Sequence, residues 1–138
     1  MYKAKRTIKA GTDSTPSASI AAHPSVPYYA VINPNSGPGD ANTQPGLEYQ
    51  QCIPILKAAS SSVTVLGYVA TFEADSAKTA GVLQDVHTYA QWDASYGVQG
   101  IFFDQVSGAT ADFAAYQNYT GEARKMFNFA SIVALLHI

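Results

Sequence analysis

The chain alternates between short apolar runs and segments of helical spacing, and this alternation leaves few folds open. The apolar, β-prone runs lie at 28–32, 63–69, 98–103 and 130–138. The segments of helical spacing lie at 47–59, 79–95 and 111–126. Apolar runs without polar alternation are typical of strands buried on both faces, so the pattern predicts right-handed βαβ units and a parallel sheet. Four such units are about half of an eight-stranded barrel, which leaves an open α/β sheet or a partial TIM-type barrel.

Composition agrees with one buried α/β domain. The chain has 138 residues, and charged residues make up 13% of it, about half the usual share of roughly 25%. Half of the eight basic residues lie in the first nine positions, so the rest of the chain holds four basic residues against ten acidic ones. An acidic body is a poor binder of nucleic acid, because binding to phosphates needs a clustered basic face. We therefore expect no nucleic-acid partner.

The N-terminal segment, which we call the lead, has the composition of a poorly ordered segment and not that of a hydrophobic core. Residues 1–19 are basic and then rich in Ser and Pro, so we expect them to be poorly ordered, with one domain over 20–138. A loop or a weak helix is expected to end near His23 and Pro24. The lead lacks the apolar stretch of a secretory signal, and no run reaches the ~18 apolar residues of a membrane span. The single cysteine, Cys52, cannot form an internal disulfide.

Two local features give sharper expectations about the helices. Pro54 lies inside the 47–59 segment, where it should kink or split a helix. In the 79–95 segment, Val82, Val86 and Tyr89 fall on one face, which places Asp85 among the outward residues. Phe113 is expected to share one apolar face of the last helix with Tyr116.

Chemistry in parallel α/β folds sits at the carboxyl ends of the strands, where the βα loops meet. Asn33, Thr71 and Asp104 stand at such ends. With a side-chain period of two, Asp104 should point to the same side as Phe102 and Gly100. Taken alone, an aspartate after a strand is more often a turn or helix-capping residue than a catalytic one.

The loop after the first apolar run suggests a nucleotide site as a minor alternative. Residues 33–39 read Asn-Pro-Asn-Ser-Gly-Pro-Gly, which is similar to the nucleotide-binding loop of diacylglycerol and sphingosine kinases. Backbone amides in such a turn can cradle phosphate. Nothing in the chain matches the Gly-Gly-Asp-Gly stretch of those kinases, and Pro38 removes one amide.

Several segments occur in a distinctive order from about residue 20 to residue 119. They lie at 23–39, 65–71, 85–92 and 97–104. In this order and spacing the chain resembles the spherulation-specific, or spherulin-4-like, family, which is related to fungal galactosaminogalactan-degrading glycoside hydrolases. The resemblance implies a (βα) barrel, hydrolysis of galactosamine-containing polysaccharide without a metal or organic cofactor, and a secreted or cell-surface location. It also implies that the chain is shorter than the family domain at both ends.

Carried over to this chain, the resemblance makes Asp104 a catalytic carboxylate and places Asn33, Tyr68 and Thr71 along the sugar cleft. Glycoside hydrolysis needs two carboxyl groups. The family pattern suggests Glu after the aspartate, whereas the chain has Gln105, which cannot hold or release a proton.

Other carboxylates are candidates for the second carboxyl group. The resemblance places a further family glutamate on a later strand, beyond Ile138. Glu73 and Asp40 lie in loops at the same end as Asp104 and could take the place of the missing carboxylate, although such loop charges are more often solvated.

Two further interpretations are a domain without catalytic activity and an inert fragment. A non-catalytic carbohydrate-binding or cell-surface domain would keep Asn33, Tyr68 and Trp92 as contacts and tolerate Gln105. Trp92 itself is expected to pack a helix onto the sheet or to form a platform for sugar.

A half barrel would leave two open strand edges, which predicts self-association. The three histidines give no basis for a metal site.

Overall fold

A computed structural model describes residues 16–127 and 133–136 of the chain. The helices are α1 (Pro16–Ala22), α2 (Leu47–Ala59), α3 (Thr79–Ala90) and α4 (Phe113–Met126). The strands are β1 (Tyr28–Ile32), β2 (Val63–Ala70), β3 (Gly100–Val106) and β4 (Val133–Leu136). Short 3₁₀ turns are η1 (Phe72–Ala74), η2 (Ser76–Lys78) and η3 (Thr110–Asp112).

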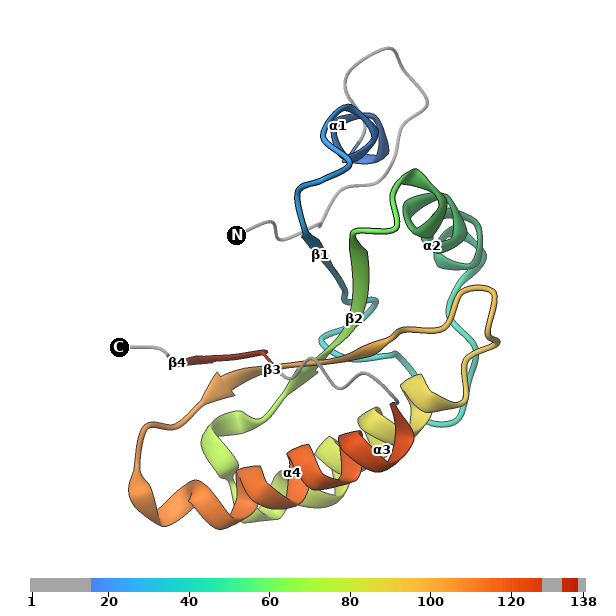
Figure 1. Cartoon of the computed structure of the whole chain (residues 1–138). Helices are drawn as coiled ribbons and strands as arrows, with labels where there is room; N and C mark the ends of the chain where they lie inside the picture. Colours follow the sequence, from blue (N-terminus) through green and yellow to red (C-terminus); the bar gives the residue numbers. More distant parts are fainter. Residues whose placement is uncertain (1–15, 128–132, 137–138) are drawn as a thin grey trace.

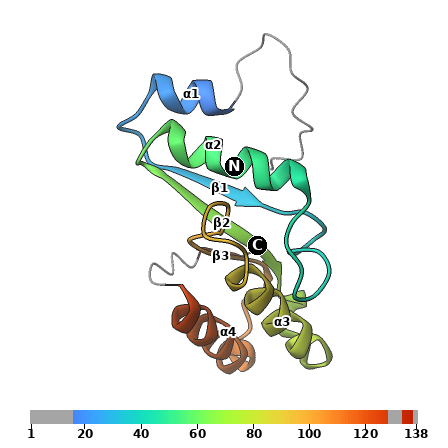
Figure 2. The same ribbon diagram turned by 90° about the vertical axis from the view of Figure 1, so that its right-hand side faces the viewer.

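The strands form one parallel sheet in the order β1-β2-β3-β4, and a helix joins each strand to the next (Figure 1). This arrangement confirms the predicted parallel α/β fold. In the view of Figure 2, α1 and α2 lie above the strands and α3 and α4 below them. Core side chains from all four helices nevertheless belong to one cluster on one face of the sheet: Ile20, Ile53, Val86 and Tyr119.

The core lies between the helices and one face of the sheet. Val65, Val69 and Phe103 supply strand side chains to it, and they meet Val86 and Tyr119 from the helices. All five are at most 2% exposed. Because consecutive strand side chains alternate between the two faces, Tyr68, Phe102 and Asp104 project from the opposite face.

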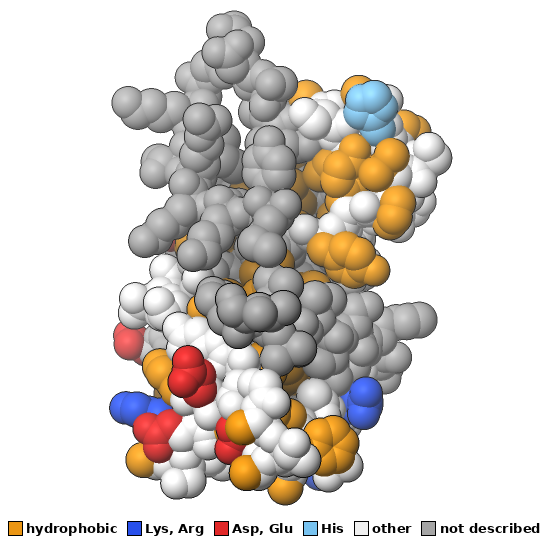
Figure 3. Space-filling model, turned by 90° about the vertical axis from the view of Figure 1, so that its left-hand side faces the viewer, with side chains coloured by type: hydrophobic (Ala, Val, Ile, Leu, Met, Phe, Trp, Pro, Cys, Tyr) orange, Lys and Arg blue, Asp and Glu red, His pale blue; other side chains and the backbone are white. Residues whose placement is uncertain are grey.

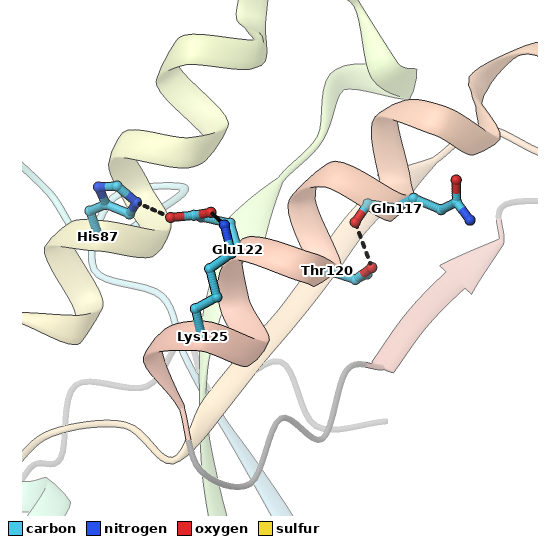
Figure 4. Close-up of polar contacts among 5 residues, drawn as sticks. All are labelled: His87, Gln117, Thr120, Glu122 and Lys125. Atoms are coloured by element: carbon cyan, nitrogen blue, oxygen red, sulfur yellow. Dashed lines mark hydrogen bonds and ion pairs between the residues drawn. The ribbon is translucent and has the colours of Figure 1, made fainter.

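Helices α3 and α4 lie side by side, and a polar cluster joins them (Figure 4). The Nζ atom of Lys125 donates to Oε2 of Glu122 at 2.8 Å, and Nε2 of His87 lies 3.2 Å from the other carboxylate oxygen. The hydrogen bond from Lys125, and then that from His87, lowers the pKa of the Glu122 carboxyl group. The cluster is a surface feature of the kind that adds little to stability.

Some helix and strand expectations were wrong in detail. Helix α2 continues through Pro54, since the adjacent Ile53 is fully buried and its packing outweighs the hydrogen bond that proline cannot make. Strand β3 runs two residues beyond Asp104, to Val106, so Asp104 lies within the strand. Phe113 stands at the first turn of α4 and is 63% exposed.

The N-terminal helix crosses the boundary that we expected between residues 19 and 20. Helix α1 ends at Ala22, just before His23 and Pro24, as the helical alternative predicted. Its Ile20 is 5% exposed and belongs to the core. Most of the expected lead, residues 1–15, and parts of the fourth apolar run, residues 130–132 and 137–138, lie outside the described residues.

Candidate functional site

Tyr68 and Asp104 form a hydrogen-bonded pair near the carboxyl ends of β2 and β3. The two strands align so that Tyr68 pairs with Phe102 and Ala70 pairs with Asp104. The Tyr68 hydroxyl donates to Oδ2 of Asp104 at 2.8 Å, and the rings of Tyr68 and Phe102 stack at 6.2 Å. This geometry confirms that Asp104 points to the side of Phe102.

The environment of Tyr68 keeps its phenol protonated. Burial, together with the hydrogen bond to the Asp104 carboxylate, raises the pKa of Tyr68 to about 12. At neutral pH the phenol therefore remains a donor and holds the Asp104 carboxylate in one orientation. Tyr68 is 9% exposed, so little of its ring is open to a ligand.

Thr71 fastens the ends of the two strands together. Its hydroxyl lies 2.9 Å from the carbonyl oxygen of Asp104 and 2.8 Å from that of Gln105, and its N–H donates to the Asp104 carbonyl at 2.9 Å. Thr71 is fully buried. The residue thus positions the backbone of Asp104 and Gln105 and offers no surface to a sugar.

Gln105 sits at an irregularity of β3. The pairing of β3 with β4 shifts register between Phe103 and Val106, and Gln105 has a left-handed φ of 56°. In a regular strand Gln105 would face the core with Phe103, but a bulge can redirect a side chain. Gln105 is exposed and lines a pocket of about 300 Å³.

That pocket is polar and is built by the η1 turn, the end of β3 and the residues that follow β3. The residues that line it are Glu73, Gln105, Val106, Ser107 and Gly108. Glu73 belongs to η1, where three consecutive residues without a glycine have φ between 50° and 64°. Left-handed backbone of this kind costs ~1–2 kcal/mol per residue and gathers at functional sites. The pocket is at the small end of the range for ligand sites.

Asn33 is not part of the Tyr68–Asp104 pair, and its side chain stabilises the loop that follows β1. It is exposed, and its Oδ1 accepts from the Gly37 N–H at 3.1 Å. The N–H of Asn35 donates to the Gly37 carbonyl at 3.2 Å. The sequence places Asn33 at the end of β1, but its amide is already engaged in holding the turn.

Asp85 packs against the same turn, contrary to the outward position expected for it. A Cβ atom added to Gly37 would come within 2.8 Å of Oδ2 of Asp85. Burial raises the pKa of Asp85 to about 6. A phosphate in this turn would meet that carboxyl group and find the Gly37 amide occupied, so the geometry disfavours the kinase-like alternative.

Sequence reasoning missed the surroundings of Glu73 and Asp85. For Asp85 a signal existed, because it lies four residues before Tyr89 and so shares part of its helix face. For Glu73 there was none, since its place depends on the left-handed backbone of η1. Asp40, the other loop carboxylate at this end, is exposed and lines no part of the pocket.

The other singled-out residues have structural roles. Trp92 is 5% exposed and packs 4.7 Å from the Tyr89 ring, so it forms no open platform for sugar. Cys52 is half-buried, and burial raises the pKa of its thiol, which makes it a weak nucleophile. Within residues 16–127 and 133–136, no cluster of His, Cys, Asp or Glu is placed to hold a metal ion. In the same part of the chain, no helix is long and apolar enough to cross a membrane.

Comparison with known proteins covers most of the chain. The model of spherulation-specific family 4 matches residues 14–135. Spherulin-4 of Physarum polycephalum is 38% identical over 104 residues, which are 74% of this chain and 29% of that protein. The chain thus spans under a third of the length of this relative. No solved structure matches the chain significantly. With this match, and the segments from 23 to 104 within it, the chain belongs to spherulation-specific family 4.

Proposed function

We propose that this domain hydrolyses glycosidic bonds in galactosamine-containing polysaccharide outside the cell or at its surface, with Asp104 as a catalytic carboxylate. The observation that carries the proposal is the hydrogen bond of 2.8 Å from the Tyr68 hydroxyl to the Asp104 carboxylate. It lies at the carboxyl ends of parallel strands, where α/β enzymes place their chemistry. The resemblance to galactosaminogalactan-degrading hydrolases supplies the substrate class.

The pair has the properties that such a carboxylate needs. Asp104 is half-buried, so a substrate can reach it, and Tyr68 fixes its orientation. A fixed carboxylate can take a proton from an attacking water or attack the sugar carbon itself. Thr71 holds the backbone of Asp104 against β2, so the group stands on a rigid element.

We also propose that the sheet is a segment of a (βα) barrel. Its strands follow one another in sequence order, and the core lies on one face of the sheet. Helices confined to one face are typical of barrels, whereas doubly wound sheets have helices on both faces. Four parallel strands make up half of such a barrel.

Incubation with α-1,4-linked galactosamine and N-acetylgalactosamine oligosaccharides tests the proposed activity. The folded protein is expected to release shorter chains, Asp104→Asn to release none, and Tyr68→Phe to lose about 10- to 100-fold because the carboxylate is no longer oriented. Chromatography of the products measures release, and circular dichroism confirms that each variant is folded. Full activity of Asp104→Asn would refute the role of this carboxylate.

One observation favours a second candidate, a domain that binds carbohydrate without cleaving it. Gln105 places a neutral amide in the polar pocket, and amides bind sugar hydroxyls without proton transfer. This candidate predicts that the folded protein cleaves none of these oligosaccharides and still binds them. Titration calorimetry with the same ligands separates the two candidates.

A further inference from the structure

Hydrolysis of a glycosidic bond needs a second carboxyl group to act with Asp104. One group donates a proton to the leaving oxygen, and the other acts on water or on the sugar carbon. Gln105 stands where the resemblance leads one to expect a glutamate, and an amide cannot carry that proton. The question is which carboxylate of the described chain is placed to replace it.

Most other carboxylates of the described residues are engaged or remote. Asp75 accepts from the Ala77 N–H, Asp93 binds Ser95, and Glu122 binds Lys125. Asp85 packs against the Gly37 turn from α3, which lies across the core from the face that carries Asp104. These groups have positions that their own contacts explain.

Glu73 is different, because it lines the same pocket as Gln105. The fold holds the two close together. Thr71 binds the carbonyl oxygens of Asp104 and Gln105, and η1 begins at the next residue. The Ala74 N–H then donates to the Thr71 carbonyl at 3.0 Å, so the turn that carries Glu73 folds back over the residues that anchor Asp104.

The backbone directs both side chains to this pocket. Glu73 and Gln105 have φ values of 53° and 56°, a conformation that residues other than glycine adopt only where the surroundings enforce it. Lys78 lies 5.8 Å from the ring centroid of Phe72 and supports the same turn. The η1 turn and the end of β3 thus bring a carboxylate and an amide together in one pocket, and the amide belongs to the residue that follows Asp104 in the chain.

We propose that Glu73 is the second catalytic carboxyl group of this site and takes the role of the carboxylate that Gln105 lacks. This inference rests on the proposed hydrolase function. The Glu73 carboxyl group gives a proton to the glycosidic oxygen as the bond from that oxygen to the sugar carbon breaks. Asp104 removes a proton from water as the water oxygen bonds to the same carbon. The products are two shorter sugars. Asp104 then releases its proton to solvent and Glu73 takes one up, which restores both groups.

Glu73→Gln tests this role with Asp40→Asn as the matched control, because Asp40 is an exposed loop carboxylate at the same end of the sheet. Loss of a general acid lowers the rate about 10²- to 10⁴-fold. Glu73→Gln should show that loss on oligosaccharides and a much smaller one on an activated aryl glycoside, whose leaving group needs no proton. Asp104→Asn should be inactive on both substrates.

A double variant makes the test independent of any structural damage. Gln105→Glu returns a carboxyl group to the same pocket. The double variant, with both Glu73→Gln and Gln105→Glu, should therefore cleave oligosaccharides at least tenfold faster than Glu73→Gln alone. Oligosaccharide cleavage by Glu73→Gln at the wild-type rate would overturn the role of Glu73 and leave the hydrolase intact. A wild-type protein that cleaves no substrate would overturn the proposed function and this inference with it.

Discussion

The Asp85 carboxyl group shows how one buried charge couples stability to pH. It is half-buried in α3 against Gly37, and burial raises its pKa to about 6, from ~4 in an unfolded chain. The folded state therefore binds the proton more tightly than the unfolded state does. The stabilising effect of protonation is complete below pH ~4 and is lost as the pH rises to about 6.

Asp85→Asn is expected to flatten this dependence and to raise stability at pH 7. The full pKa difference would correspond to ~3 kcal/mol, and screening at a half-exposed site reduces this to ~1 kcal/mol. Urea unfolding at several pH values from 4 to 7 measures the slope. Asp40→Asn makes the same chemical change at an exposed position and should leave the slope unaltered. An unchanged slope in Asp85→Asn would contradict the prediction.

At this scale the sequence identified some residues and missed others for a physical reason. The side of the sheet on which Asp104 lies followed from strand alternation, which local sequence determines. The neighbours of Glu73 depend on left-handed backbone at positions without glycine, and tertiary contacts enforce such backbone. No sequence pattern in the chain predicts this left-handed backbone.

Between elements, the packing of α3 against β2 depends on a glycine. The Tyr89 ring lies over Gly67, where an added Cβ atom would come within 2.8 Å of three ring carbons. The ring is 1% exposed, and its hydroxyl donates to the Ile32 carbonyl at 2.9 Å. It therefore has neither the space nor the freedom to move aside.

Gly67→Ala should destabilise the protein by about 1–3 kcal/mol, the usual cost of overpacking a core. Gly81 in α3 gives a matched control, because a Cβ atom there would meet nothing within 4 Å. Gly81→Ala should stabilise by ~0.5–1 kcal/mol through helix propensity. Denaturant midpoints measure both effects. Equal stability of the two alanine variants would show that Tyr89 does not pack as described.

Element type was predictable here because periodicity and burial agree, as in β2, whose residues are nearly all buried. The ends of the helices and strands, and whether a helix is broken, were not predictable in the same way. Pro54 indicated a broken helix, but the packing of Ile53 keeps α2 whole. Local propensity is a weak signal that tertiary packing overrides, so the unbroken helix could be known only from the core.

Among the described residues, the sheet of four strands has two outer strands. Strand β1 borders one edge of the described sheet and β4 the other. An outer strand leaves backbone N–H and C=O groups unpaired. Figure 3 shows hydrophobic side chains over the half of the molecule that contains α1 and β1, where Val26 and Tyr29 are 45% and 57% exposed.

We propose that two copies of this chain pair through these edges. In a twofold dimer, β1 of each copy can lie beside and parallel to β4 of the other copy. The two sheets together would then form a closed barrel of eight strands. Light scattering over a range of concentrations should detect the dimer. Tyr29→Lys should weaken it at least tenfold, because a lysine on an outer strand opposes pairing. Phe113→Lys, at an exposed position on α4, should leave the dimer intact. A chain that stays monomeric at every concentration, or one that Phe113→Lys dissociates equally, would refute pairing at the sheet edges.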